Sequence, residues 1–278
     1  MSMDAREIHD GLVPEIKELL TFVAVGYSIR ELGDELEKLS EYFQALGIAY
    51  LLENADQDRF RENLVRSGHA RRYFLRKSRE DNNAEDRRLA LGRTEAFLDV
   101  LAAGQLRLAR EIVDLSIEAW HPDWEYEDDF SYYLFLHRLV RANPDATEEN
   151  LREILATFAR ALEDGESPRL DVCKAFLDRD TNSLREALVR LMEVRDKEME
   201  KARGRNQEPD PPACVCWARS FVSIEGLALL RVAELIGMTP LEPGEELQLC
   251  PGLAMLPVGD RDYLDMLTSI EQELARGR

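Results

Sequence analysis

A cluster of carboxylates mixed with aromatic residues lies between His121 and His137, in the stretch HPDWEYEDDFSYYLFLH. Five carboxylates fall within the seven residues 123–129, where they alternate with Trp124 and Tyr126. Side chains of these types could bind a metal ion, act as general acids and bases, or present a charged surface with aromatic anchors to a basic partner. The simplest alternative is the acidic first turn of a buried helix, because the helix dipole favours negative charge there.

A metal ion would need more ligands than this stretch can supply. Glu125 and Asp129 share a helix face at positions i and i+4, and His121 or His137 could add a nitrogen ligand. However, His137 would lie about 18 Å from Glu125 along a straight helix that rises 1.5 Å per residue. The sequence nominates no ligands elsewhere, so we expect neither a metal nor a cofactor.

A purely structural role explains part of the acidic stretch. Asp123 is a candidate N-cap, the acids at 125–129 would then occupy the first turns, and His137 would lie on the buried face as a hydrogen-bonded core or boundary residue. One or two carboxylates satisfy a helix dipole, whereas five add repulsion among themselves. We therefore expect something basic to face them.

The chain itself contains one basic segment, residues 59–93, with eleven arginines and lysines against five acids. Arg72, Arg76 and Arg79 would share one side of a helix there, with Tyr73 and Phe74 elsewhere on it. Three interpretations remain open: a nucleic-acid patch, an internal partner of the acidic stretch, or an ordinary solvated helix.

Charge and composition favour a protein partner. The 36 Lys and Arg residues against 55 Asp and Glu give a net charge of −19, which repels nucleic acid and anionic membranes and attracts basic partners. No segment is long enough to cross a bilayer, and the N-terminus lacks the features of a signal peptide. The four cysteines are too few for a disulfide scaffold, so we expect free thiols in a cytoplasmic protein.

No familiar catalytic motif is present. The sequence lacks the serine-hydrolase elbow, the phosphate-binding loop, the dinucleotide-binding glycine pattern, the zinc-protease histidine pair and the redox cysteine pair. We therefore expect no catalytic residues and no enzymatic activity.

Apolar residues recur at helical spacing along most of the chain, and alternating strand-like runs are absent. A capping box at Ser28 and Glu31 precedes one such helix, and Gly104 and Gly237 follow others as C-caps. The pattern predicts helices over residues 29–46, 84–103, 106–117, 125–140, 148–162, 183–202, 218–236 and 261–274.

Two segments of the chain resemble each other. Residues 101–115 align without gaps on residues 177–191, and both read as a helix, a short turn and a second helix. Any two amphipathic hairpins could align this well, but the pattern favours an all-α fold of stacked antiparallel hairpins, an irregular array similar to helical-repeat proteins.

The clearest break in the helical pattern is rich in proline. It divides the chain into a main helical body at 1–203, a linker at 204–213, and a C-terminal helical part at 214–278 that packs back on the body. The packing is expected because the C-terminal helix is apolar almost all round.

Several of these segments, in this order, resemble the immunity protein 49 family of bacterial polymorphic toxin systems. They are RRYFL at 71–75, LGRTEAFLDVLAAGQLRLAREIVDLS at 91–116, AWHPDWEYEDDFSYYLFLHRLV at 119–140, SPRLDVCKAFLDRDTNSLREAL and IEGLALLRVAELIGM, and the most specific part is WEYEDDF at 124–130. The resemblance covers about residues 60–240. It implies an all-helical, non-enzymatic protein, encoded beside a secreted toxin, that binds the toxin and protects the producing cell. The family offers no binding residues to carry over.

The residues themselves suggest how such binding would work. Many toxins of these systems act on nucleic acid through a positive groove, which an acidic surface could fill. Trp124 and Tyr126 would be the anchors and the five acids the charged contacts. The predicted partner-binding residues are Asp123, Trp124, Glu125, Tyr126, Glu127, Asp128 and Asp129.

Two other classes of function stay open. A helical-hairpin scaffold would bind peptides or partner helices in a concave groove. A carboxylate- or metal-dependent hydrolase would need at least two acids that converge in a pocket with raised pKa values.

Overall fold

The structure is a computed structural model that describes residues 5–93, 95–141, 147–163, 165–203, 213–238, 247, 249–255 and 263–276. Within these residues the chain forms twelve α-helices and three short 3-10 helices, and no strand. The predicted all-α class is therefore confirmed.

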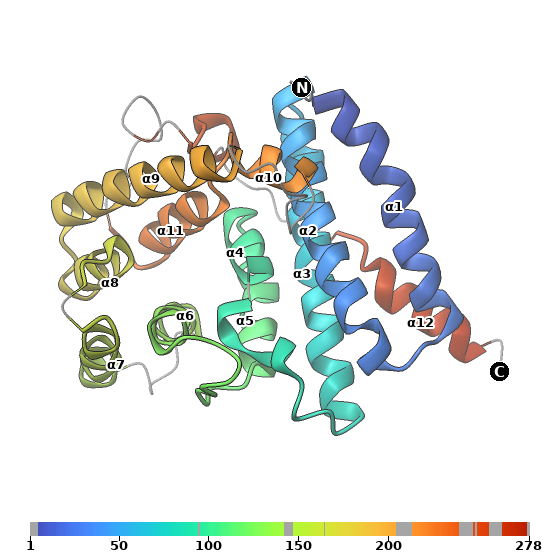
Figure 1. Cartoon of the computed structure of the whole chain (residues 1–278), viewed down its shortest axis with the longest axis horizontal. Helices are drawn as coiled ribbons and strands as arrows, with labels where there is room; N and C mark the ends of the chain where they lie inside the picture. Colours follow the sequence, from blue (N-terminus) through green and yellow to red (C-terminus); the bar gives the residue numbers. More distant parts are fainter. Residues whose placement is uncertain are drawn as a thin grey trace.

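Three long helices build one end of the molecule (Figure 1). They are α1 (Ala5–Val25), α2 (Ile29–Asn54) and α3 (Gln57–Glu80), each antiparallel to the one before, and α12 (Met266–Arg276) lies across α1 and α3. The predicted capping box is present at the start of α2, where the backbone N–H of Ser28 donates to the Glu31 carboxylate at 2.9 Å.

The middle and the far end continue the same pattern of short helices packed on their sequence neighbours. These elements are η1 (Arg87–Leu89), η2 (Leu91–Arg93), α4 (Glu95–Ala102), α5 (Leu106–Leu115), α6 (Glu127–Arg141), α7 (Glu148–Ala161), α8 (Pro168–Asp178) and α9 (Thr181–Arg203). The predicted stack of antiparallel hairpins is observed. Both segments of the internal sequence similarity are hairpins, α4 with α5 and α8 with α9. Gly104 and Gly237 both have φ +75°, as their predicted C-cap positions require.

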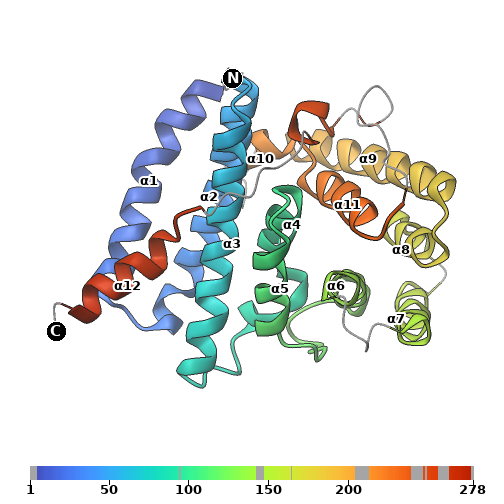
Figure 2. The same cartoon turned by 180° about the vertical axis from the view of Figure 1, so that it is seen from behind.

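The last elements return to the middle of this stack, which makes the array irregular. The helix α10 (Ala213–Arg219) packs on α2, while α11 (Ile224–Leu235) packs on α4 and α6, and η3 (Gly252–Met255) touches α3. Figure 2 shows α11 beside α4, with α9 on its other side. Of the predicted linker 204–213, only Ala213 lies within the described residues. The division into the parts 1–203 and 214–278 stays a prediction.

One continuous apolar core runs through the described helices. No single described helix is long and apolar enough to cross a membrane. The helices α10 and α11, bent by 43° at their junction, are long and apolar enough only when they are taken together.

Candidate functional site

The acidic segment, residues 123–129, lies at the end of the connection between α5 and α6. We call residues 117–126 the aromatic loop. Its turn is closed by the backbone N–H groups of Trp124 and Glu125, which both donate to the carbonyl of His121. The helix α6 begins only at Glu127, and its first turn is closed by Phe130 N–H donating to the carbonyl of Tyr126 at 3.0 Å.

Asp123 is therefore not an N-cap, and that prediction is wrong. The tight turn at His121 uses the residues that were expected to form the first turn of the helix. Asp123 is left in the loop with an exposed side chain.

Glu125 turns inward and ties the loop to the short helix η2. Its carboxylate accepts hydrogen bonds from Leu91 N–H at 3.1 Å and Gly92 N–H at 2.5 Å. Burial raises the pKa of Glu125, against the lowering effect of these two donors. Its backbone carbonyl also accepts a hydrogen bond from the Trp120 indole at 3.1 Å. Glu125 thus fixes the loop from both its side chain and its backbone.

Asp129 also turns inward, toward a half-buried arginine. Arg169 of α8 pairs with Asp129 at 3.0 Å and with Glu225 of α11 at 2.7 Å, and its guanidinium lies 4.8 Å from the centre of the Tyr132 ring. Burial raises the pKa of Asp129, which the charge of Arg169 opposes. The three charged residues hold α6, α8 and α11 together.

Of the other three acids, Asp123 is exposed, and Glu127 and Asp128 are half-buried. Glu127 lies 3.9 Å from the exposed Arg160, a distance at which a pair in water contributes little. Among the described residues, no cation lies within ion-pairing distance of Asp123 or Asp128. Asp128 adds to the repulsion felt by Asp129 and raises its pKa.

The aromatic residues of the loop also differ in how far they are exposed. Trp124 is half-buried against the core and stacks on His121, with ring centres 4.1 Å apart. Tyr126 is 79% exposed and Trp120 is 41% exposed. No helical period extends through the loop, so the sequence does not show which of these side chains are exposed. The exposed aromatic pair is thus Trp120 and Tyr126.

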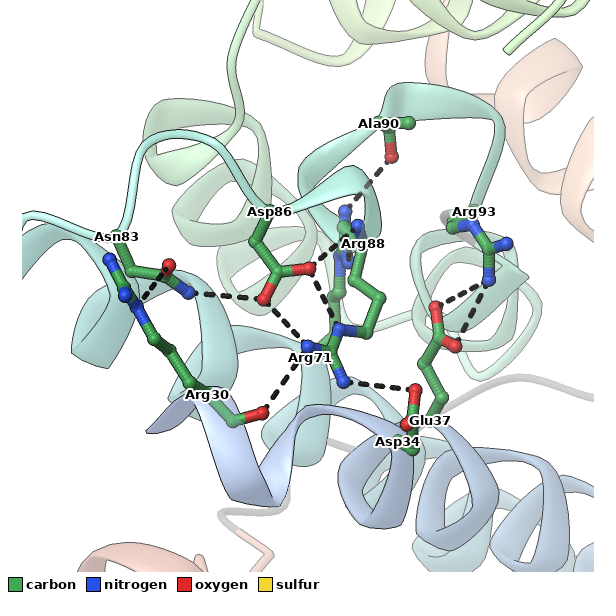
Figure 3. A network of polar contacts seen from close by, with 9 residues as sticks. All are labelled: Arg30, Asp34, Glu37, Arg71, Asn83, Asp86, Arg88, Ala90 and Arg93. Atoms are coloured by element: carbon green, nitrogen blue, oxygen red, sulfur yellow. Dashed lines mark hydrogen bonds and ion pairs between the residues drawn. The ribbon is translucent and has the colours of Figure 1, made fainter. Parts of the chain in front are cut away.

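The basic segment, residues 59–93, is mostly neutralised inside the molecule by acids that lie outside the acidic segment. Arg93 pairs with Glu37 at 3.0 Å, and Arg88 pairs with Asp86 at 2.7 Å and Asp34 at 2.9 Å (Figure 3). The acidic segment and the basic segment are joined by hydrogen bonds from the backbone N–H groups of Leu91 and Gly92 to Glu125.

This network closes one wall of a groove between α2 and η2 with a volume of about 520 Å³. Arg71 lies at the groove, is 6% exposed, and donates to the carbonyls of Arg88 and Ala90. Burial lowers the pKa of Arg71 to about 10. The ion pairs of Arg88 and Arg93 bridge the basic segment to α2, so the network is structural.

His137 is fully buried, as expected of a core residue, and its ring packs edge-on against Phe97 at 4.4 Å. Neither ring nitrogen has a hydrogen-bond partner, so the expected hydrogen bond is absent. Burial lowers the pKa of His137 to about 3, which keeps the ring neutral. Within the described part of the chain, no three His, Cys, Asp or Glu side chains form a group that could hold a metal ion.

Comparison with known families and proteins complements this geometry. A model of the family described as immunity protein 49 matches residues 58–252, which is more than half of the chain. Neither the curated proteins nor the solved structures give a match. The matched region contains the basic segment, the aromatic loop and the helices α3–α11. The chain therefore belongs to the immunity protein 49 family, and its role is of the immunity type.

Proposed function

We propose that this chain neutralises a cognate secreted toxin by binding it in the cytoplasm through the aromatic loop and through Asp123, Glu127 and Asp128 of the acidic segment. The observation that carries the proposal is the exposed side chain of Tyr126, 79% exposed on a loop that internal hydrogen bonds hold in place. A rigid, exposed aromatic ring loses little conformational entropy when a partner covers it.

Charge supports a basic partner. Asp123, Glu127 and Asp128 lie close to Tyr126 in the chain and are exposed or half-buried, and the whole molecule carries a net charge of −19. Such a field speeds encounter with a positive surface and disfavours neutral or acidic ones. A toxin that acts on nucleic acid presents a positive groove of this kind, so a nuclease is the toxin class that fits best.

The seven predicted residues would then contribute in two ways. Tyr126, with Trp120 added from the structure, would be the anchor that the toxin covers, and Asp123, Glu127 and Asp128 the charged contacts around it. Glu125 and Asp129 would act indirectly, by holding the loop and the start of α6 in position. Trp124 would support the loop from beneath through its stacking on His121.

A hydrolase is less well supported than binding. Glu125 and Asp129 are the acids of this region whose pKa values are raised. However, their carboxylates are engaged by Leu91, Gly92 and Arg169, and neither residue lines the groove beside η2. A pair of acids that converge in a pocket is the arrangement that hydrolysis requires.

The test is the affinity of the toxin domain encoded beside this chain for Tyr126→Ala. We expect the dissociation constant to rise at least 30-fold, which corresponds to about 2 kcal/mol, because the anchor is lost. The matched control is Tyr27→Ala, which removes a 46% exposed tyrosine at the turn between α1 and α2 and should change affinity less than twofold. Equal effects of the two substitutions would remove the aromatic loop from the interface.

A further inference from the structure

The C-terminal helix α12 lies on a row of basic side chains of α3. We call His69, Arg72, Arg76 and Lys77 the α3 strip. Glu271 of α12 pairs with Arg76 at 2.5 Å and also with Lys77. Asp265, which precedes α12, pairs with Arg72 and lies 3.8 Å from His69. Two acids of the C-terminal segment thus match the charges of the strip.

Apolar residues seat α12 against both α1 and α3. Leu267 is its one fully buried residue, while Met266 and Ile270 are half-buried. A cavity of about 410 Å³ remains between α12, α3 and the turn between α1 and α2, and Tyr27, Tyr73 and Leu274 line it. An isolated helix of 11 residues is marginally stable in water, so α12 stays helical because it packs on α1 and α3.

The ion pairs make the contact charge-dependent. Burial opposes ionisation of Glu271, but hydrogen bonds from Arg76 and Lys77 outweigh it and lower the pKa of Glu271. The strip also has acids of its own: Arg72 pairs with Glu111 at 2.5 Å, and Lys77 with Glu80 at 2.8 Å. Its side chains are therefore not left as isolated buried charges when α12 leaves, and α3 can remain folded.

We propose that α12 is a releasable strap, and that the α3 strip beneath it is a binding surface for an acidic helix, which α12 occupies in this structure. The strip lies within the residues that match the immunity family, 58–252, whereas α12 lies outside them. The α3 strip is thus part of the region that matches the family, whereas the helix that covers it is not. The kind of ligand follows from the occupant: a short helix with one carboxylate at its start and a second one six residues later.

The first test compares two charge reversals on α12. Glu271→Lys places a positive charge against Arg76 and Lys77, while the control, Glu273→Lys, makes the same change at an exposed position. We expect amide hydrogen exchange in residues 266–276 to become at least tenfold faster in Glu271→Lys, with the exchange of α11 unchanged. The control should match the wild-type chain. Unchanged protection of α12, or loss of protection in α11 as well, would overturn the strap, because α12 would then be part of the cooperative core.

The second test asks whether the uncovered strip binds an acidic helix supplied in trans. The probe is a fluorescent synthetic peptide of residues 263–276 with its natural sequence, added to the full-length chains at low salt. We expect Glu271→Lys to bind it at least tenfold more tightly than the wild-type chain, whose strip is occupied. Adding Arg76→Glu and Lys77→Glu to the same chain should abolish peptide binding and restore the protection of α12 by charge exchange. Equal binding by all three chains would contradict the proposal.

Discussion

Glu125 and Asp129 lie four residues apart in the acidic segment, and both carboxylates turn inward. Glu125 accepts two backbone N–H groups of η2, and Asp129 pairs with Arg169. Asp123 and Asp128, close to them in sequence, have no cation within ion-pairing distance among the described residues, and Asp123 is exposed. At the scale of single residues, the same side-chain type therefore has two different roles, and substitutions should separate them.

Arg169→Met tests the buried charge cluster. The substitution leaves Glu225, whose side chain is 8% exposed, without its cation, and it also frees Asp129. Loss of one partner of a buried pair costs about 3 kcal/mol of unfolding free energy, because the remaining carboxylate stays desolvated. Urea unfolding should show this loss. Arg160→Met, at a residue 72% exposed and 3.9 Å from Glu127, should change stability by less than about 0.5 kcal/mol. A small effect at Arg169 would mean that water reaches the cluster.

Asp99 gives a prediction about pH. It is 1% exposed, accepts hydrogen bonds from Gln44 at 2.6 Å and from Ser67, and burial raises its pKa to about 7. The folded chain therefore keeps a proton that the unfolded chain releases above about pH 4, so the contribution of Asp99 to stability falls as pH rises from about 4 to 7 and is constant beyond.

Asp99→Asn removes this dependence while it keeps a group that can accept from Gln44. We expect the variant to be more stable relative to the wild-type chain at pH 8 than at pH 5, by about 2.6 kcal/mol of unfolding free energy. Denaturant unfolding at both pH values measures the difference, and the other titrating groups cancel in the comparison. Parallel pH curves for the two chains would show that Asp99 is ionised throughout.

At the scale of secondary-structure elements, η2 is the support on which the aromatic loop rests. A Cβ atom on Gly92 would come within 2.9 Å of the Glu125 carboxylate, which two backbone N–H groups hold in place. Gly92→Ala should therefore break those hydrogen bonds and cost about 1 kcal/mol of unfolding free energy.

The matched control is Gly11→Ala in the middle of α1. A Cβ there meets nothing within 4 Å, so the substitution should stabilise the chain by about 0.5–1 kcal/mol. Thermal unfolding of the two variants should shift in opposite directions. Equal shifts would mean that Glu125 does not need the glycine.

The helical spacing of apolar residues predicted most of these helices. The predicted boundaries were wrong where a side chain caps a different turn. The predicted helix 84–103 begins only at Glu95, because the Asp86 side chain caps the 3-10 helix η1 instead. The predicted helix 218–236 is two helices, since Ser223 caps α11 through Gly226 N–H. The helix α1 was not predicted, and of α8 only the end was predicted, as part of the hairpin at 177–191.

The candidate site was only partly predictable for the same kind of reason. The sequence locates the carboxylates but cannot show that Glu125 meets Leu91, 34 residues earlier, or that Asp129 meets Arg169, 40 residues later. Those contacts depend on how the helices stack. The exposure of Trp120 was not predictable, because the loop around it has no helical period.

At the scale of the whole molecule, the surplus of negative charge is not spread evenly. The basic segment is neutralised by acids of α2, of α3 and of the C-terminal segment, while Asp123 and Asp128 are left without a counter-charge in the described structure. Association with a basic toxin should therefore be fast at low salt and slow down as salt screens the field, with a smaller effect on dissociation.

The most direct measurement is the dissociation constant of the complex with the neighbouring toxin domain for Asp123→Lys combined with Asp128→Lys. The control, Glu186→Lys with Glu193→Lys, makes the same change in net charge at exposed positions of α9. We expect the first pair to weaken binding at least 100-fold at low salt and the control less than fivefold, with the helical circular dichroism of both chains unchanged. Equal losses of affinity in the two variants would mean that only the net charge matters. No loss in either variant would contradict binding through the acidic segment.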